Sequence, residues 1–552
     1  MSCAPVKGSK KASQWLKLLK DPAGGLREEL ERIYGHDPVV LAEAVGACRR
    51  TVEVFADAFG RDAQAVIVRS TGRVNLLGTH IDHRGGFTNP IAVKDLFLVA
   101  EPRADGCVVL RNVESDRYPD ESFSISEELP GAKIGDWDHW TQDRTEERRR
   151  SGRAGNWSNY VRAAILYLQH LHTDARGRFD PPLRGMNAVV YGRVPPAAGL
   201  SSSSSLVVAA ADACIRINAL ALTSMDLVEA CAAAEWYVGT RGGGADHAAI
   251  KFGRLDHIMH VGSFPFSVDW LPFPPGYGIV LANSLKKAEK SAGARDIFNQ
   301  RIACYVFGLA LVRKNLPELA PKLQHLRDIS PQNLGADEGE VYRIIRSLPE
   351  TATREEIRRA LTGQEELVER TFRTHAGPQE GYKIRQVCLY GVCECLRSSM
   401  APEMLRKGDV PGFGRLITYS HDGDRVSRLV EGRRIACVKG IPDLEIDRLI
   451  ADVRSADADR QERARLWRQP GGYDASTEEL DTLVDAALAT DGVVGAGLVG
   501  AGLGGSIVAV VEEAGLPQLM RSLERHYYRP RNLPVAVEVV RPVGGASVLD
   551  ID

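Results

Sequence analysis

The chain has 552 residues, and its 70 Lys+Arg are balanced by 72 Asp+Glu. This near neutrality argues against a nucleic-acid-binding protein, in which basic residues are in clear excess. Hydrophobic residues make up 44% of the chain, a proportion typical of globular proteins, and the length predicts two or three domains. The first twenty residues lack an apolar secretory segment, and the ten cysteines lack a disulfide framework, so we expect a cytoplasmic protein.

The first part of the chain is predicted to mix helices and strands. Residues 1–40 are helical in character and form an N-terminal extension to which we assign no role. Strand patterns rich in β-branched residues follow in AVIVRSTGRVNLLG, FTNPIAVKDLFLVAEP and GCVVLRNVE. Residues 135–157 carry so many charges that we expect a loop, with its arginines solvated rather than part of a binding site.

The most informative stretch is VPPAAGLSSSSSLVVAAADAC, residues 194–214. A strand and a rigid proline turn precede the serines and an apolar helical pattern follows, which argues against a flexible linker. The serines therefore lie at a helix N-terminus, where free N–H groups favour an anion. Their hydroxyls suit Mg²⁺, and the lack of a P-loop lysine excludes that class of nucleotide site. We predict a phosphate-binding loop, with a plainly capped helix as the alternative.

The later part of the chain is predicted to be largely helical and polar. Residues 320–372 are helical and charged, and residues 426–470 have the composition of an insertion. One helical segment contains Cys388, Cys393 and Cys395, but no further Cys or His completes a tetrahedral metal site. We expect these cysteines to be buried as small apolar side chains.

Residues 492–511, GVVGAGLVGAGLGGSIVAVV, contain seven glycines and no charge. A dinucleotide-binding turn follows a strand and opens a helix, whereas here a helix with a capping box at Ser476 and Glu479 comes first and the strand SIVAVV follows. A membrane helix is disfavoured because each glycine weakens a helix by about 1 kcal/mol. The remaining interpretation is a compact glycine loop that packs its backbone against a neighbouring active-site loop.

Three motifs in this order resemble the galactokinase branch of the GHMP kinase superfamily. GRVNLLGTHIDHRGG, residues 72–86, is similar to the galactokinase signature. PPAAGLSSSSS, residues 195–205, is similar to the family's phosphate-binding loop, and GAGLVGAGLGG, residues 495–505, to its closing glycine motif. Lesser similarities, among them FGRLITYSHDGD, fall in the expected order, so that the resemblance covers about residues 45–545.

The resemblance implies an α+β, two-domain GHMP kinase fold with the active site in the cleft between the domains. A ribosomal-protein-S5-domain-2-like N-terminal domain would span residues 41–265. A ferredoxin-like C-terminal domain would span residues 266–552, with a helical insertion at about 426–470.

The implied reaction is ATP-dependent phosphorylation of a monosaccharide at its anomeric hydroxyl, giving a sugar 1-phosphate and ADP, with ATP and Mg²⁺ as cofactors. Arg73 matches the family arginine beside the reacting hydroxyl, and Asp246 matches the aspartate that accepts or orients its proton. Ser203 and Glu235 match the Mg²⁺ ligands, with Ser202 or Ser204 as alternatives for the serine. The ATP phosphates would be lined by Gly199, Leu200, Ser201, Ser202, Ser203 and Ser204.

Five positions match those that contact the sugar in the family: Thr79, His80, Asp82, Gly244 and Phe298. Thr79 stands where the family signature has Glu, and the loss of this carboxylate admits a sugar with its own C6 carboxylate, or a pentose. Arg84 and Lys286 are candidates to pair with such a carboxylate. Phe298 replaces a usual Tyr, which removes one hydrogen bond to the sugar.

Two further functions stay open beside a galactokinase-like sugar kinase. Within the class, the substrate is galactose, galacturonate, arabinose or an amino sugar. From another class, a non-catalytic sensor of sugar and ATP is the rival, against which the retention of Arg73 and Asp246 argues. The implied partners are a small-molecule sugar and ATP, with no nucleic acid and no membrane, and the oligomeric state is not predicted.

Overall fold

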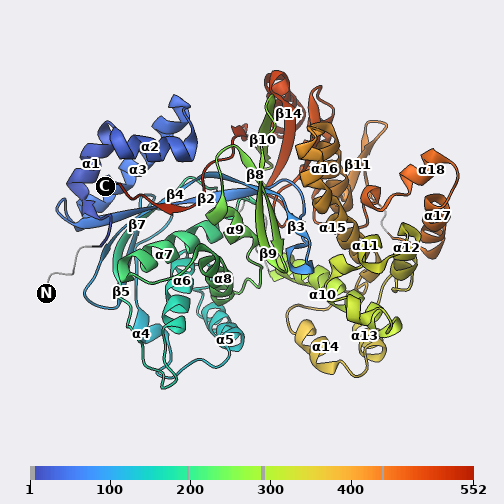
Figure 1. The fold of residues 1–552 in the computed structure, drawn as a ribbon, viewed down its shortest axis with the longest axis horizontal. Coiled ribbons are helices and arrows are strands. Elements are labelled where there is room, and N and C mark those ends of the chain that lie inside the picture. The colour runs from blue at the N-terminus through green and yellow to red at the C-terminus, as the bar shows by residue number, and fades with distance from the viewer. Residues whose placement is uncertain (1–5, 196–197, 287–291, 438–439, 552) are drawn as a thin grey trace.

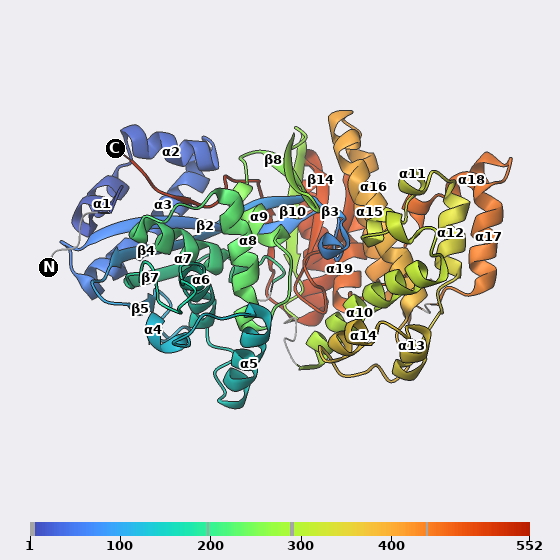
Figure 2. The same cartoon turned by 60° about the horizontal axis from the view of Figure 1, so that its bottom comes forward.

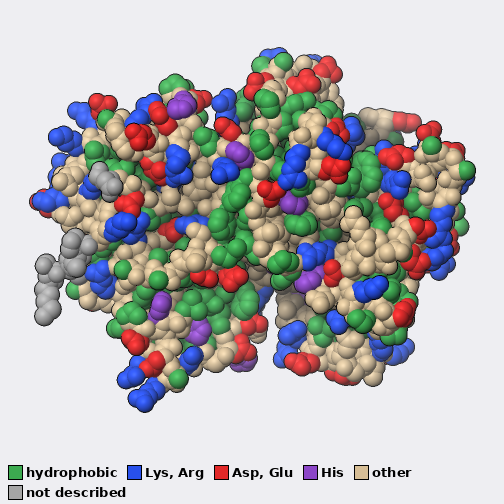
Figure 3. Space-filling view, in the orientation of Figure 1, with side chains coloured by type: hydrophobic (Ala, Val, Ile, Leu, Met, Phe, Trp, Pro, Cys, Tyr) green, Lys and Arg blue, Asp and Glu red, His purple; other side chains and the backbone are tan. Residues whose placement is uncertain are grey.

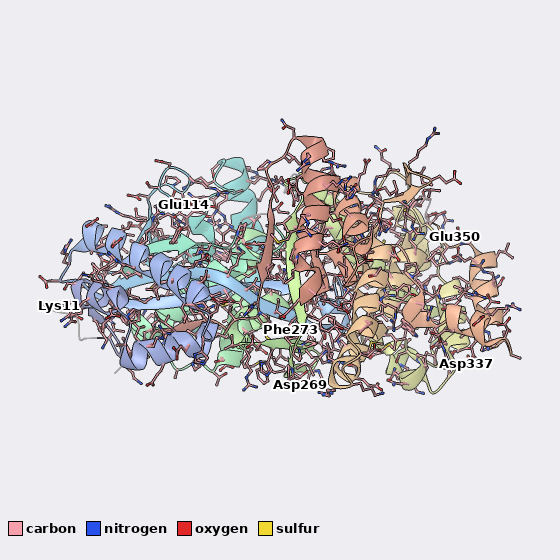
Figure 4. All side chains as sticks on the ribbon, turned by 90° about the horizontal axis from the view of Figure 1, so that it is seen from above. Lys11, Glu114, Asp269, Phe273, Asp337 and Glu350 are labelled. Carbon is pink, nitrogen blue, oxygen red and sulfur yellow. The ribbon has the colours of Figure 1, made fainter. Side chains whose placement is uncertain are left out.

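The computed structural model describes residues 6–195, 198–286, 292–437 and 440–551. Two bodies lie side by side along the long axis (Figure 1). The first body is built on a seven-stranded sheet, and the second combines a four-stranded sheet with most of the helices beyond residue 292. Figure 4 shows them from above, with Lys11 at the far end of the first body, Asp337 and Glu350 on the second, and Asp269 and Phe273 between them.

The sheet of the first body has the order β1-β2-β4-β7-β5-β6, with β16 paired to β2. Its strands are β1 (Lys10–Lys11), β2 (Gln64–Asn75), β4 (Pro90–Pro102), β5 (Cys107–Asn112), β6 (Glu121–Ser124), β7 (Met186–Gly192) and β16 (Ser547–Val548). Side chains alternate across a strand, so Val66 and Val68 of β2 face one layer while Ala65 and Ile67 face the other. The first layer includes α6 (Ser158–Leu171), α7 (Ser202–Asn218) and α8 (Ser224–Ala234), and the second α1 (Ala12–Lys20), α2 (Gly24–Tyr34) and α3 (Pro38–Phe59).

The N-terminal extension is part of this body rather than a separate tail. Trp15 of α1 is fully buried, and its Nε1 donates a hydrogen bond to the carbonyl of Ala65 at 2.9 Å. Because β16 also joins β2, both ends of the chain lie against the same sheet, as Figure 1 shows.

The four-stranded sheet of the second body has the order β13-β14-β10-β15. Its strands are β10 (Tyr277–Asn283), β13 (Val493–Leu498), β14 (Ser506–Glu512) and β15 (Val537–Val540). A smaller sheet has the order β3-β8-β9, with strands β3 (Phe87–Thr88), β8 (His257–Ser263) and β9 (Phe266–Pro272). The main helices of the second body are α10 (Ala292–Asn315), α12 (Glu338–Arg346), α13 (Arg354–Ala360), α14 (Glu365–Phe372), α15 (Ile384–Arg406), α16 (Val410–Asp424), α19 (Glu478–Leu488) and α20 (Leu516–Leu523).

The bodies share one apolar cluster, in which Leu76 and Leu200 of the first pack with Leu416 and Val499 of the second. This arrangement confirms the predicted α+β fold. The charged segment at 135–157, predicted as a loop, is instead largely helical in α5 (Trp137–Arg150). Asp136 caps its N-terminus, and salt bridges between residues three and four positions apart stabilise it, so that its charges support a helix rather than a loop.

Two other expectations change in detail. The segment at 426–470, predicted as a helical insertion, begins with a hairpin of β11 (Ser427–Val430) and β12 (Arg433–Ala436), and only then forms α17 (Asp443–Val453) and α18 (Ala458–Arg463). Helix α19 begins at Glu478, so its cap is Thr477, whose side chain accepts the N–H of Leu480, rather than the predicted capping box of Ser476 and Glu479; Ser476 lies before the cap and donates to Asp481.

The cysteine helix is confirmed as α15, in which the three cysteines are buried, and no group of metal ligands was found among the described residues. Within the same residues, no helix has the length and apolar character needed to cross a bilayer. Figure 3 shows acidic and basic side chains interspersed over one face of the molecule, in line with its balanced composition.

Candidate active site

The serine run opens helix α7, as the sequence predicts. Gly199 and Ser201 have left-handed backbones, with φ of 81° and 53°, and α7 begins directly afterwards at Ser202. The N-terminal N–H groups of this helix form a potential anion site. The serines have different surroundings: Ser205 is buried and donates to Ser70 Oγ at 3.2 Å, whereas Ser202 and Ser203 stay partly exposed. Pro196 lies outside the described residues.

The glycine stretch packs against the serine loop. A side chain on Gly199 would place its Cβ 2.4 Å from the carbonyl oxygen of Val499, and one on Gly500 would come within 2.9 Å of the Gly199 Cα. Both glycines are therefore required for the close approach of the two backbones. The predicted packing is confirmed, but the first part of the stretch is strand β13 and only residues 499–505 form the turn.

Arg73 and Asp246 form the centre of the site. Arg73 lies near the end of β2, two residues before Asn75, and Asp246 lies in the first turn of α9 (Ala245–Phe252), two residues after the N-cap Gly244. The guanidinium donates from Nε and Nη2 to the two carboxylate oxygens of Asp246 at 2.6 Å and 2.8 Å, and from Nη1 to the carbonyl of Gly199 at 2.5 Å. The Ser201 hydroxyl also donates to Asp246, at 2.5 Å.

These contacts determine the charge of Asp246. Burial opposes its ionisation, but the positive charge and hydrogen bonds of Arg73, together with Ser201, hold the pKa of this carboxyl below its ordinary value. Asp246 is therefore a carboxylate at neutral pH, and it is held in one orientation between the serine loop and β2.

The signature loop contacts the glycine loop that precedes Asp246. The Gly243 N–H donates to His83 Nε2 at 3.0 Å, and Asp82 Oδ2 lies 3.5 Å from the same nitrogen. A side chain on Gly243 would come within 3.0 Å of both residues, so glycine is needed at this contact. The structure thus brings the predicted residues Asp82 and Gly244 into the neighbourhood of Asp246.

Thr79 and His80 are buried against the second body. Thr79 Oγ1 lies 3.3 Å from both Tyr390 OH and Ser420 Oγ. The His80 ring stacks on Tyr473 with centroids 4.0 Å apart, and its side chain is only 3% exposed. Tyr390, Ser420 and Tyr473 were not expected at the site, although Ser420 lies in FGRLITYSHDGD, one of the segments that resemble the family.

The two cations proposed to bind a sugar carboxylate differ in their surroundings. Lys286 Nζ contacts both carboxylate oxygens of Glu479 at 3.0 Å, so its charge is already paired. Arg84 lies over the Tyr305 ring at 5.6 Å, and burial lowers its pKa. Arg84 forms no salt bridge with a described residue, and the nearby charge of Asp82 partly offsets the effect of burial on its pKa. Phe298 is partly buried on α10, one turn before Arg301, whose guanidinium lies over Tyr473.

The residues expected to bind Mg²⁺ supply oxygen donors of the right kind, and the serine beside Glu235 is Ser204, one of the two alternatives to Ser203. Ser204, not Ser203, contacts Glu235, and its hydroxyl donates to Glu235 Oε1 at 2.7 Å. His247 Nε2 lies 3.5 Å from the same oxygen. A buried carboxylate and a hydroxyl at the start of α7 are the hard oxygen donors that Mg²⁺ prefers beside a phosphate.

Family models match three parts of the chain. The GHMP kinase N-terminal domain matches residues 159–254, the galactokinase galactose-binding signature residues 53–100, and the GHMP kinase C-terminal domain residues 449–529. The chain thus contains both GHMP kinase domains together with a galactokinase galactose-binding signature. The matched segments contain Arg73, Asp246 and the whole glycine stretch.

Individual relatives agree with this assignment. The chain is 26% identical over 485 residues to a galactokinase of Roseiflexus sp. (strain RS-1), covering 87% of this chain and 92% of the relative. It is 26% identical over 491 residues to a galactokinase of Homo sapiens, covering 88% and 93%. The solved structure of Lactococcus lactis galactokinase complexed with galactose has the same fold, with a TM-score of 0.61, 22% identity, and coverage of 90% of this chain and 98% of that one.

Proposed function

We propose that this protein is a Mg·ATP-dependent sugar 1-kinase, which transfers the γ-phosphoryl group of ATP to the anomeric hydroxyl of a monosaccharide and releases ADP. The observation that carries the proposal is the Arg73–Asp246 pair, held between the start of α7 and the signature loop. The relatives named galactokinase support the same class. A cytoplasmic location and a domain boundary near residue 265 are part of the proposal.

The serine loop would bind the phosphates of ATP. The N-terminal N–H groups of α7 and the left-handed turn at Gly199 form an anion site, which the turn at residues 499–505 supports from behind. Ser204 and Glu235 would hold Mg²⁺. When bound, this ion neutralises charge on the phosphates during phosphoryl transfer.

Asp246 and Arg73 would act on the sugar hydroxyl. The O–P bond to the sugar forms as the bond from the γ-phosphorus to the leaving ADP oxygen breaks, and the hydroxyl proton leaves through Asp246. The lowered pKa makes Asp246 a weak base, which favours orientation of the hydroxyl, with proton loss late in a loose transition state. Arg73 keeps the carboxylate in place and stabilises negative charge near the transferred group.

A galacturonate kinase is the second candidate, and Arg84 favours it. Arg84 is a desolvated cation without an ion pair among the described residues, whereas Lys286 is neutralised by Glu479. Thr79 adds no negative charge to the signature loop, so a sugar carboxylate meets no repulsion from this position. A pentose such as arabinose has no C6 carboxylate with which Arg84 could form an ion pair.

ADP release over a panel of sugars tests both candidates. We expect turnover of galactose, galacturonate, arabinose or N-acetylgalactosamine, and a loss of about 10²- to 10⁴-fold in kcat for Asp246→Asn. Arg84→Met should weaken galacturonate turnover selectively, while Lys286→Met serves as the matched control. Efficient turnover of galactose alone would exclude the uronate candidate. ATP binding without ADP release on any sugar would instead favour the non-catalytic sensor.

A further inference from the structure

A completely buried ion pair lies behind the signature loop. Glu394 and Arg397, one turn apart on α15, are both 0% exposed, and Arg397 Nε donates to Glu394 Oε2 at 2.7 Å. Arg397 also donates to the carbonyls of Trp467 and Gln469, so the pair is tied to the second body. Burying two charges is expensive, and such a pair is therefore weak evidence for stability alone.

The other oxygen of Glu394 reaches the signature loop. Glu394 Oε1 accepts the N–H of Gly78 at 2.8 Å and the hydroxyl of Ser420 at 2.8 Å. Hydrogen bonds to an ionised acceptor are about twice as strong as neutral ones. The turn depends on glycine, since Gly78 has a φ of 90° and a Cβ there would lie 2.0 Å from the carbonyl oxygen of Phe87.

Ser420 extends this contact to the next residue of the loop. Its hydroxyl lies 3.3 Å from Thr79 Oγ1, which in turn lies 3.3 Å from Tyr390 OH. A cavity of only about 10 Å³ borders Thr79, Ser420 and Asp424, enough for about one water molecule. A Glu at position 79 would therefore be crowded and would bring a further carboxylate beside Glu394 and Asp424.

We propose that Glu394 is a positioning residue for sugar recognition: it holds from α15 the turn that presents Asp82, His83 and Arg84. The loop leaves β2 of the first body and is fastened by α15 of the second, and Figure 2 shows the blue segment around β3 lying among β14, α15 and α16. This inference rests on the proposed function in so far as the ligand of the loop is a sugar. Among the described residues, the hydrogen-bond partners of Glu394 are Gly78, Arg397 and Ser420, none of them in the serine loop, so ATP binding should be largely independent of Glu394.

Glu394→Gln tests the proposal, with Glu403→Gln as its control on the same helix. Glu403 is exposed and pairs with Lys407 at 2.6 Å, so its loss removes an ion pair without touching the loop. We expect Glu394→Gln to speed amide hydrogen exchange in residues 76–89 and to raise the KM for the sugar, each by about tenfold or more. The KM for ATP should change by less than about twofold, and Glu403→Gln should leave all three quantities unchanged.

Two further variants keep the test decisive if Glu394→Gln folds poorly. Glu394→Gln with Arg397→Met removes both buried charges, and Ser420→Ala leaves the ion pair and the Gly78 bond intact while breaking the link to Thr79. The double variant should behave like Glu394→Gln, and Ser420→Ala should raise the KM for the sugar by a smaller factor.

Unchanged exchange in residues 76–89 in the folded variants would overturn the proposal, as would an equal rise of both KM values. The exchange measurement needs no substrate. If the wild-type protein phosphorylates no sugar, the proposed function fails. Amide hydrogen exchange in residues 76–89 still tests whether Glu394 holds the loop.

Discussion

Arg73 and Asp246 are joined by two hydrogen bonds of 2.6 Å and 2.8 Å, although 173 positions separate them in the chain. The pair joins the end of β2 to the start of α9, and Ser201 of the phosphate loop joins it from a third segment. A charged donor at each carboxylate oxygen both orients Asp246 and keeps it ionised.

Replacement of Arg73 should change the pH dependence of the reaction. The folded protein lowers the pKa of Asp246, so activity that needs the carboxylate is present above this pKa and is lost as the pH falls through it. In Arg73→Met, burial still raises the pKa of Asp246 while the positive charge that lowers it is gone. The pKa should therefore rise, and the acidic limb of the residual activity should move to higher pH. Profiles of kcat against pH would show this shift. Arg103→Met, which removes the ion-pair partner of the exposed Asp105, should leave the limb in place, and an unmoved limb in Arg73→Met would refute the electrostatic coupling.

Gly199→Ala should damage ATP binding more than backbone strain alone explains. Gly199 and Gly276 share a φ of 81°, but a Cβ on Gly276 meets no atom within 4 Å. Each alanine costs about 1–2 kcal/mol for the left-handed backbone. Gly199→Ala should lose about 1–3 kcal/mol more because it overpacks against Val499, and it should raise the KM for ATP by about tenfold or more. Denaturant unfolding and ATP titration check both values, and equal losses in the two variants would contradict the packing argument.

The register of the magnesium ligands can be tested with the two neighbouring serines. Ser204 contacts Glu235, whereas Ser203 is partly exposed. Glu235→Gln and Ser204→Ala should each raise the Mg²⁺ concentration needed for half-maximal activity by about tenfold, and Ser203→Ala should change it far less. Mn²⁺ binding followed by electron paramagnetic resonance gives a readout independent of turnover. If Ser203→Ala instead had the larger effect, Ser203 would be the Mg²⁺ ligand, as the family resemblance implies.

Ionisation of Asp481 should make the free energy of unfolding depend on pH in the acidic range. Asp481 is fully buried, and although burial opposes its ionisation, contacts with His421, Ser476 and Ser427 lower its pKa to about 2. A depressed carboxyl pKa stabilises the folded state above the ordinary Asp value, and this contribution is lost as the pH falls toward about 2.

Asp481→Asn should therefore reduce the free energy of unfolding by about 2–3 kcal/mol at pH 7 and by about half as much at pH 3. Urea unfolding at both pH values measures this difference. Asp62→Asn is the control, since Asp62 is 86% exposed and pairs only with Lys11 among the described residues. A penalty for Asp481→Asn that does not shrink at low pH would contradict the linkage.

Much of the candidate site could be predicted because its motifs are local. The serine run precedes an apolar helix, and the glycine stretch follows a helix and enters a strand, so neighbours in the chain decide the local structure. The segment at 135–157 was predicted wrongly because charge was taken as a sign of a loop, whereas a cap at Asp136 and charges spaced by three and four residues stabilise α5.

The sequence by itself determined the order of the motifs, and from them predicted the family resemblance and Arg73 and Asp246 as site residues. Only the tertiary structure decided which distant groups meet: Ser204 with Glu235, Lys286 with Glu479, and Glu394 with the N–H of Gly78. Secondary structure depends on residues a few positions apart, which can be read along the chain. The partner of a buried charge is distant in the chain and comes into contact with it only in the folded core. Arg84 shows the same division, because its place in the signature is visible in the sequence and its lack of a described ion-pair partner is visible only in the fold.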